Sequence, residues 1–135
     1  MIVVDVNVVA YLLIEGGKTE RARALRAADP QWRVPPLWRS EFLNVLAMQV
    51  QHGGFDVKAA DQLWKVAARL LFRCEVEVEP VRVLRLAAEQ QITAYDAQYV
   101  ALAQQLGVVC VSEDRALQRK FPRLVFPMAI LLGSR

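Results

Sequence analysis

The sequence has few of the side chains that most often bind transition metals or act as nucleophiles. Its 135 residues include one histidine, His52, and two cysteines, Cys74 and Cys110, without CxxC spacing. A tetrahedral zinc site takes about four such ligands, so the composition argues against one. None of the three serines lies in a GxSxG motif, which argues against a serine-hydrolase nucleophile. Any bound metal would therefore be a hard cation on oxygen ligands.

Long apolar runs and low-complexity tracts are also missing. Charged residues interrupt every apolar stretch well before the roughly 18 residues that a membrane-spanning helix needs. The first five residues contain Asp5 and no basic segment, which is unlike a signal peptide. Glycine and proline number only six each, and no internal repeat occurs. We therefore expect one globular domain over residues 1–135, without a membrane partner and located in the cytoplasm.

The charge balance is mildly basic. The formal net charge is +3, and arginine supplies 13 of the 17 basic residues. This excess is compatible with a phosphate-rich partner such as a nucleic acid, and equally with ordinary surface charge that maintains solubility.

Apolar patterning predicts an α/β fold with helices on both faces of a mostly parallel sheet. The apolar runs at residues 2–6 and 108–111 are typical of strands that are buried on both faces. The Val-Glu alternation at residues 75–79 predicts a strand with one solvated face. The expected strands are 2–6, 32–34, 75–79, 108–111 and 124–126, and the expected helices are 7–14, 19–28, 37–51, 56–72, 81–90, 94–106 and 113–120. Strands that alternate with helices indicate a parallel sheet, whose ligands bind at the carboxyl ends of the strands.

Four acidic residues occupy positions where a solvated side chain is unexpected. Asp5 interrupts the first apolar run, and Asp114 closely follows the apolar run at 108–111. Glu41 and Asp96 have apolar neighbours one helical turn away. Each residue alone could be an ordinary helix cap or sheet-edge residue, but together they predict one shared acidic pocket. Their mutual repulsion would be relieved by a divalent cation, and Mg²⁺ or Mn²⁺ is the natural candidate for oxygen ligands.

Two neutral polar residues are expected beside this pocket. Asn7 lies two residues after Asp5, and Ser112 lies two residues before Asp114. They could orient the carboxylates, or they could simply cap the helices that follow, and the sequence is compatible with both roles.

Four segments carry a resemblance to a known family: residues 5–7 (DVN), 40–42 (SEF), 93–103 (TAYDAQYVALA) and 111–114 (VSED). They resemble PIN-domain ribonucleases, most of all the toxin subunits of VapBC toxin–antitoxin pairs, over nearly the whole chain. The resemblance implies a PIN-like three-layer α/β/α sandwich and a Mg²⁺- or Mn²⁺-dependent endoribonuclease. It also implies a homodimer and a VapB-like antitoxin partner. The implied catalytic and metal-binding residues are Asp5, Glu41, Asp96 and Asp114, with Asn7 and Ser112 as supporting polar residues.

Metal-assisted phosphodiester hydrolysis needs no catalytic histidine or serine, in agreement with the composition. Arg39 and Arg115, each near an acidic residue in the sequence, are candidates for contacting the phosphates of the RNA substrate, although simple charge balance also explains them. Three alternatives stay open: a phosphoacceptor signalling domain, a catalytically silent RNA-binding module, and an RNA-processing nuclease without an antitoxin. The first lacks the adjacent acids that it requires after the first strand.

Overall fold

A four-stranded parallel sheet forms the centre of the molecule. The computed structural model describes residues 1–133, so Ser134 and Arg135, the end of the expected domain, lie outside the described part. The strand order is β2-β1-β3-β4, and each neighbouring pair runs parallel. The strands are β1 (Ile2–Val4), β2 (Trp32–Arg33), β3 (Cys110–Val111) and β4 (Val125–Phe126).

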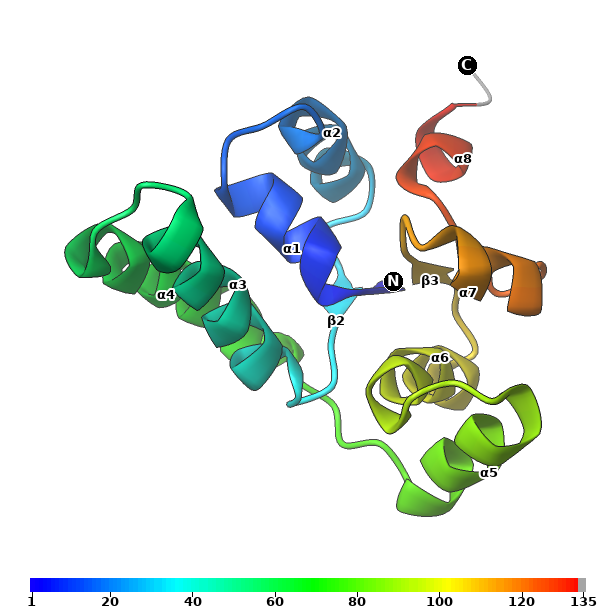
Figure 1. Ribbon diagram of the computed structural model, residues 1–135. Helices are drawn as coiled ribbons and strands as arrows, with labels where there is room; N and C mark the ends of the chain where they lie inside the picture. Colours follow the sequence, from blue (N-terminus) through cyan, green and yellow to red (C-terminus); the bar gives the residue numbers. More distant parts are fainter. Residues whose placement is uncertain (134–135) are drawn as a thin grey trace.

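Helices cover both faces of this sheet (Figure 1). They are α1 (Val6–Leu13), α2 (Thr19–Ala28), α3 (Trp38–His52), α4 (Val57–Leu71), a short 3₁₀ turn η1 (Phe72–Cys74), α5 (Pro80–Gln90), α6 (Ala94–Leu106), α7 (Arg115–Lys120) and α8 (Met128–Leu132). Successive side chains of a strand point to opposite faces. Accordingly Ile2 and Val4 pack with α1 to α4, whereas Val3 packs with α5, α6 and α7. The predicted three-layer α/β/α sandwich with a parallel sheet is confirmed.

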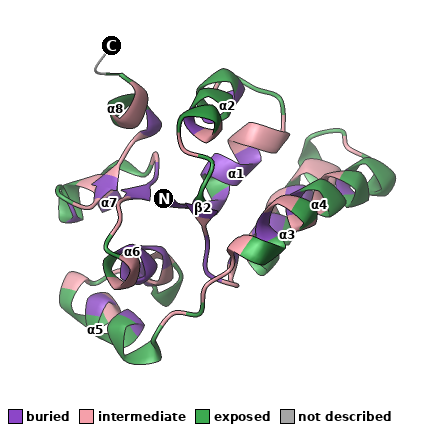
Figure 2. Cartoon of the chain, turned by 180° about the vertical axis from the view of Figure 1, so that it is seen from behind, coloured by how far each residue is buried: buried purple, intermediate pink, exposed green. Residues whose placement is uncertain are grey.

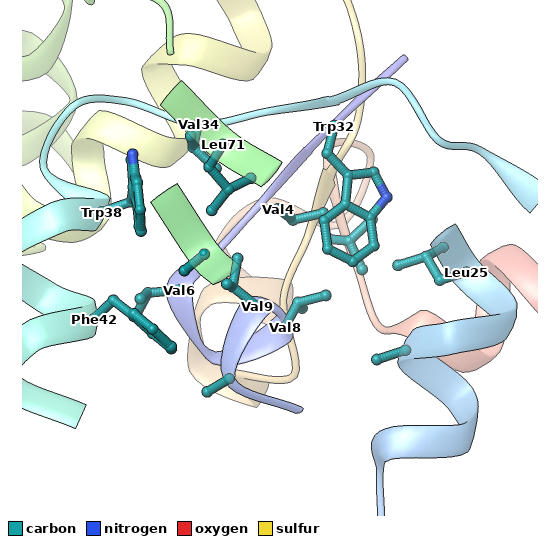
Figure 3. Close-up of a cluster of buried hydrophobic side chains, with 14 of the residues drawn as sticks. Val4, Val6, Val8, Val9, Leu25, Trp32, Val34, Trp38, Phe42 and Leu71 are labelled. Atoms are coloured by element: carbon teal, nitrogen blue, oxygen red, sulfur yellow. The ribbon is translucent and has the colours of Figure 1, made fainter. Parts of the chain in front are cut away.

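Two hydrophobic cores hold these layers together. In the first, Val4, Val9, Trp32 and Phe42 are almost completely buried between β1, β2, α1 and α3 (Figure 3). Figure 2 shows that buried residues gather on the sides of the helices that face the sheet, and that the outer sides are exposed. None of the helices formed by residues 1–133 is long and apolar enough to cross a bilayer.

The prediction of a strand at residues 75–79 is wrong. Within the described chain, only Glu75 makes a β-bridge, a parallel one with Val34. Further along, the Gln105 side chain replaces a neighbouring strand: its amide donates to the Glu77 carbonyl (3.0 Å) and its oxygen accepts from the Glu79 N–H (3.1 Å). The Glu77 carbonyl and the Glu79 N–H are thereby satisfied without a β-ladder.

Glu75 is not solvated either, contrary to the interpretation of the Val-Glu alternation. Its carboxylate accepts one hydrogen bond from Trp38 Nε1 (2.6 Å) and two from the Arg39 guanidinium (2.7 Å each). Trp38 also stacks on Trp64 of α4, with ring centroids 5.3 Å apart. These contacts fix the first turn of α3, which carries Glu41, against α4 and the segment after it.

Core packing under α3 generates a stability prediction. Phe42 is fully buried, and its neighbour Leu43 is 50% exposed. Phe42→Ala should lower the free energy of unfolding by about 3–5 kcal/mol, because it leaves a cavity in the first core. Leu43→Ala, the control on the same helix, should cost less than about 1 kcal/mol. Urea titration followed by circular dichroism measures both values, and equal losses would contradict this account of the core.

Candidate active site

The four predicted acidic residues line one small cavity at the carboxyl edge of the sheet. The cavity has a volume of about 80 Å³ and is lined by Asp5, Val6, Asn7, Glu41, Asp96, Tyr99, Ser112, Asp114 and Leu117. Asp5 and Asp114 follow β1 and β3, and Glu41 and Asp96 come from the first turns of α3 and α6. The chain thus brings together four carboxylates that are far apart in the sequence.

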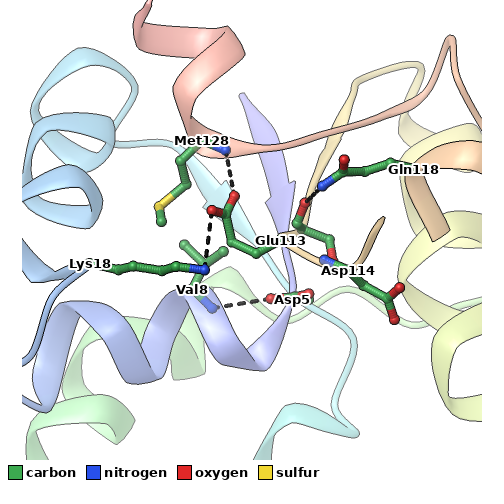
Figure 4. Close-up of polar contacts among 8 residues, drawn as sticks. Asp5, Val8, Lys18, Glu113, Asp114, Gln118 and Met128 are labelled. Atoms are coloured by element: carbon green, nitrogen blue, oxygen red, sulfur yellow. Dashed lines mark hydrogen bonds and ion pairs between the residues drawn. The ribbon is translucent and has the colours of Figure 1, made fainter. Parts of the chain in front are cut away.

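Asp5 connects the sheet to the first helix. Its backbone N–H donates to the Val111 carbonyl (3.1 Å), which continues the pairing of β1 with β3. Its side chain caps α1 by accepting from the Val8 N–H (3.1 Å; Figure 4). Burial raises the pKa of the Asp5 carboxyl to about 6, and a hydrogen bond from Ser112 lowers it in part.

Asp114 caps a helix in the same way. Its Oδ1 accepts from the Leu117 N–H (3.0 Å) at the start of α7, and its own N–H donates to Ser112 Oγ (3.1 Å). Ser112 is fully buried between Asp5 and Asp114. Asp5 and Asp114, and not their polar neighbours, are therefore the caps of α1 and α7. Ser112 forms hydrogen bonds with both Asp5 and Asp114. Asn7 is exposed and lines the wall of the cavity.

Glu41 and Asp96 complete the acidic wall. Glu41 accepts a hydrogen bond from the Tyr99 hydroxyl (2.5 Å to Oε1). Burial, followed by the charge of Asp96, raises the pKa of Glu41 above its ordinary value. Burial, followed by the charge of Asp114, raises the pKa of Asp96. The carboxylates therefore destabilise one another's charged forms, as expected for an anionic pocket.

Tyr99 is a site residue that the sequence pattern does not reveal, because it reads as one of the apolar neighbours of Asp96. It is buried, and its hydroxyl is aimed at the Glu41 carboxylate. The signal was its position three residues after Asp96, which puts both side chains on one face of α6.

The donor set suits Mg²⁺ or Mn²⁺, because such ions prefer carboxylate oxygens. Across residues 1–133, however, no three acidic, histidine or cysteine side chains are gathered closely enough to hold a metal ion as they stand. The carboxylates share the walls of one cavity without converging on one point.

The two arginines predicted near the acids differ in their surroundings. The Arg39 guanidinium binds Glu75 and lies 4.3 Å from the centre of the Phe72 ring, so its charge balances Glu75 and not the acidic cavity. Arg115 is the exposed first residue of α7, directly after Asp114.

Glu113 does not belong to the acidic wall. Its carboxylate accepts from the Met128 N–H (2.9 Å) and pairs with Lys18 Nζ (3.5 Å; Figure 4). Glu113 thus joins α8 to the loop before α2. Asp114, not Glu113, is the N-cap of α7, whose first residue is Arg115.

Comparison with known proteins identifies the family of this chain. The family model of the PIN domain matches residues 2–122. The chain belongs to the PIN-domain family. Ribonuclease VapC3 of Pyrobaculum aerophilum is 30% identical over 130 residues, which cover 93% of this PIN-domain chain and 98% of that protein.

Two solved structures share the PIN-domain fold. PAE2754 from Pyrobaculum aerophilum superposes with a TM-score of 0.78 at 25% identity, over 98% of this chain and 94% of that one. A toxin-antitoxin complex from Klebsiella pneumoniae has a TM-score of 0.66 at 17% identity, over 95% of this chain and 98% of that one. The second likeness shows the fold alone.

The raised pKa of Asp5 generates a prediction about stability. The unfolded chain releases this proton near pH 4 and the folded chain near pH 6, so without metal a charged Asp5 destabilises the fold above pH 6. Asp5→Asn should therefore raise the free energy of unfolding by up to about 3 kcal/mol at neutral pH. The gain should shrink as the pH falls from 6 to 4. Asparagine also caps helices, so α1 should remain.

Urea titrations at several pH values, with chelator present, measure this gain. Asp56→Asn is the control: Asp56 is the exposed cap of α4 and accepts from the Ala59 N–H in the same manner (2.7 Å). Asp56 lies outside the cavity, so Asp56→Asn should have the same free energy of unfolding as the unchanged protein at each pH. A gain that does not depend on pH would contradict the assigned burial of the Asp5 charge.

Proposed function

We propose that this PIN-domain protein is an endoribonuclease that hydrolyses RNA phosphodiester bonds with the help of Mg²⁺ or Mn²⁺. The observation that carries the proposal is the single cavity lined by Asp5, Glu41, Asp96 and Asp114. RNA as the substrate class rests on the relative named as a ribonuclease, which matches nearly the full length of this chain.

The four carboxylates are the groups that would hold the ion. When bound, it would supply positive charge that stabilises the phosphate during displacement. Ser112 and Tyr99 keep Asp5, Asp114 and Glu41 in place through their hydroxyls. Burial raises the pKa values of Asp5, Glu41 and Asp96, and repulsion between the carboxylates is a smaller cause. A bound cation would stabilise their charged forms.

We further propose that the protein is the toxin of a toxin–antitoxin pair and acts in the cytoplasm as a homodimer. The name VapC3 and the toxin-antitoxin complex of the same fold support the antitoxin partner. Val81 (49%) and Leu84 (66%) are exposed apolar side chains one turn apart on α5, and they support a partner surface.

Loss of one carboxylate tests the catalytic proposal. Asp96→Asn should lower the rate of cleavage of single-stranded RNA with Mg²⁺ by on the order of 100-fold or more. Asp61→Asn, on the exposed face of α4, should keep the full rate. EDTA should abolish cleavage by the unchanged protein. Its circular dichroism spectrum should stay the same, because the two cores are built from apolar side chains. Wild-type turnover in Asp96→Asn would overturn the site, and a silent RNA-binding module would bind RNA without any cleavage.

The homodimer has its own measurement. Light scattering at micromolar concentration should give twice the chain mass of 15.2 kDa. The mass of a single chain throughout that range would remove the dimer from the proposal and leave the catalytic part unaffected.

A further inference from the structure

A larger hollow adjoins the acidic cavity. It has a volume of about 550 Å³, and it shares Val6, Asn7 and Glu41 with the cavity. Its remaining lining comes from the first half of α3, the residue before it and the start of α6. A polymer whose reacting group lies in the acidic cavity would therefore continue directly into this hollow.

The lining combines an aromatic ring with neutral hydrogen-bonding groups. Tyr95, one residue before Asp96, is 60% exposed although it is large and aromatic. Ser40 and Asn44 are exposed and lie one turn apart on α3, so they present a hydroxyl and an amide from one helix face. Among the described residues that line the hollow, only Glu41 is charged.

This chemistry suits a base better than a phosphate. Unpaired RNA bases stack on aromatic side chains and form hydrogen bonds along their edges with amides and hydroxyls. A phosphate would call for a cationic side chain. Another hollow that Asn7 also lines does contain a cationic side chain, Lys18. Its Nζ pairs with Glu113 (3.5 Å) and lies 5.1 Å from the centre of the Tyr11 ring.

We propose that the hollow of Tyr95, Ser40 and Asn44 binds one unpaired nucleobase next to the phosphate that is cleaved. The inference rests on the proposed ribonuclease function and adds a specificity-determining site to it. Tyr95 stacks on the base, and Asn44 and Ser40 contact its edge, so these residues influence which nucleotide flanks the cleaved bond.

The first test separates binding from chemistry. Tyr95→Ala should raise the KM for single-stranded RNA of about ten nucleotides on the order of tenfold, because one stacking contact is lost, while kcat stays within about threefold. Tyr95→Phe keeps the ring and should retain the wild-type KM. Ile130→Ala, on α8 and 59% exposed, is the control for loss of an exposed apolar side chain and should change neither constant.

The second test uses the RNA itself. Cleavage of a random single-stranded pool identifies the preferred flanking nucleotides, and Asn44→Ala should change that preference. Replacing the flanking base with an abasic sugar should raise the KM of the unchanged protein. On this abasic RNA, the unchanged protein and Tyr95→Ala should have equal KM values. Equal KM values for the protein and Tyr95→Ala, or a difference that persists on the abasic RNA, would overturn the base site.

Fluorescence anisotropy with the same labelled RNA distinguishes this failure from failure of the proposed function. If no protein cleaves RNA, the ribonuclease proposal fails, and weaker RNA binding by Tyr95→Ala still supports the base site. If the unchanged protein cleaves RNA and Tyr95→Ala binds it equally well, the base site alone is wrong. Loss of binding to a protein partner in Tyr95→Ala with unchanged RNA affinity would assign the hollow to that partner.

Discussion

The pairing of β1 with β3 is the interaction on which the acidic site depends. The register aligns Val3 with Cys110 and Val4 with Val111, and the Asp5 N–H extends it to the Val111 carbonyl. A shift of one residue would turn Asp5 to the other face of the sheet and away from Ser112. Because both strands are buried by helices on both faces, hydrophobic packing sets this register, and the sheet then holds two carboxylates close together.

Two residues of the acidic cavity, Asp5 and Asp114, also stabilise the fold as helix caps. Asp5 and Asp114 each accept a backbone N–H at the start of a helix, so their side chains remain useful to the fold without a cation. The same position at a helix N-terminus favours their negative charge. The hydrogen bonds offset only part of the burial cost for Asp5, whose pKa stays raised. The protein thus carries a local instability that is concentrated where binding of a cation would be most favourable.

The sequence was most informative where apolar patterns were continuous. Residues 94–106 were expected to be helical and match α6, and the apolar runs that carry Asp5 and precede Asp114 form the paired strands. Prediction failed where a side chain replaced a regular partner, as Gln105 does beside Glu77. The sequence around Glu75 does not indicate that its carboxylate accepts hydrogen bonds from Trp38 and Arg39. These residues lie more than one helix away along the chain. The role of Tyr99 could not be predicted from its apolar neighbours in the sequence. Its burial and its hydrogen bond to Glu41 arise only in the tertiary structure.

The central claim is that the four carboxylates act together as one cation site. Calorimetric titration of the full chain with Mn²⁺, at pH values near 5 and near 7, tests it most directly. Binding should be tighter near pH 7, because the ion must displace the proton that Asp5 retains up to about pH 6. Asp96→Asn should bind Mn²⁺ much more weakly at both pH values. No binding to the unchanged protein, or equal binding to Asp96→Asn with no dependence on pH, would contradict the account.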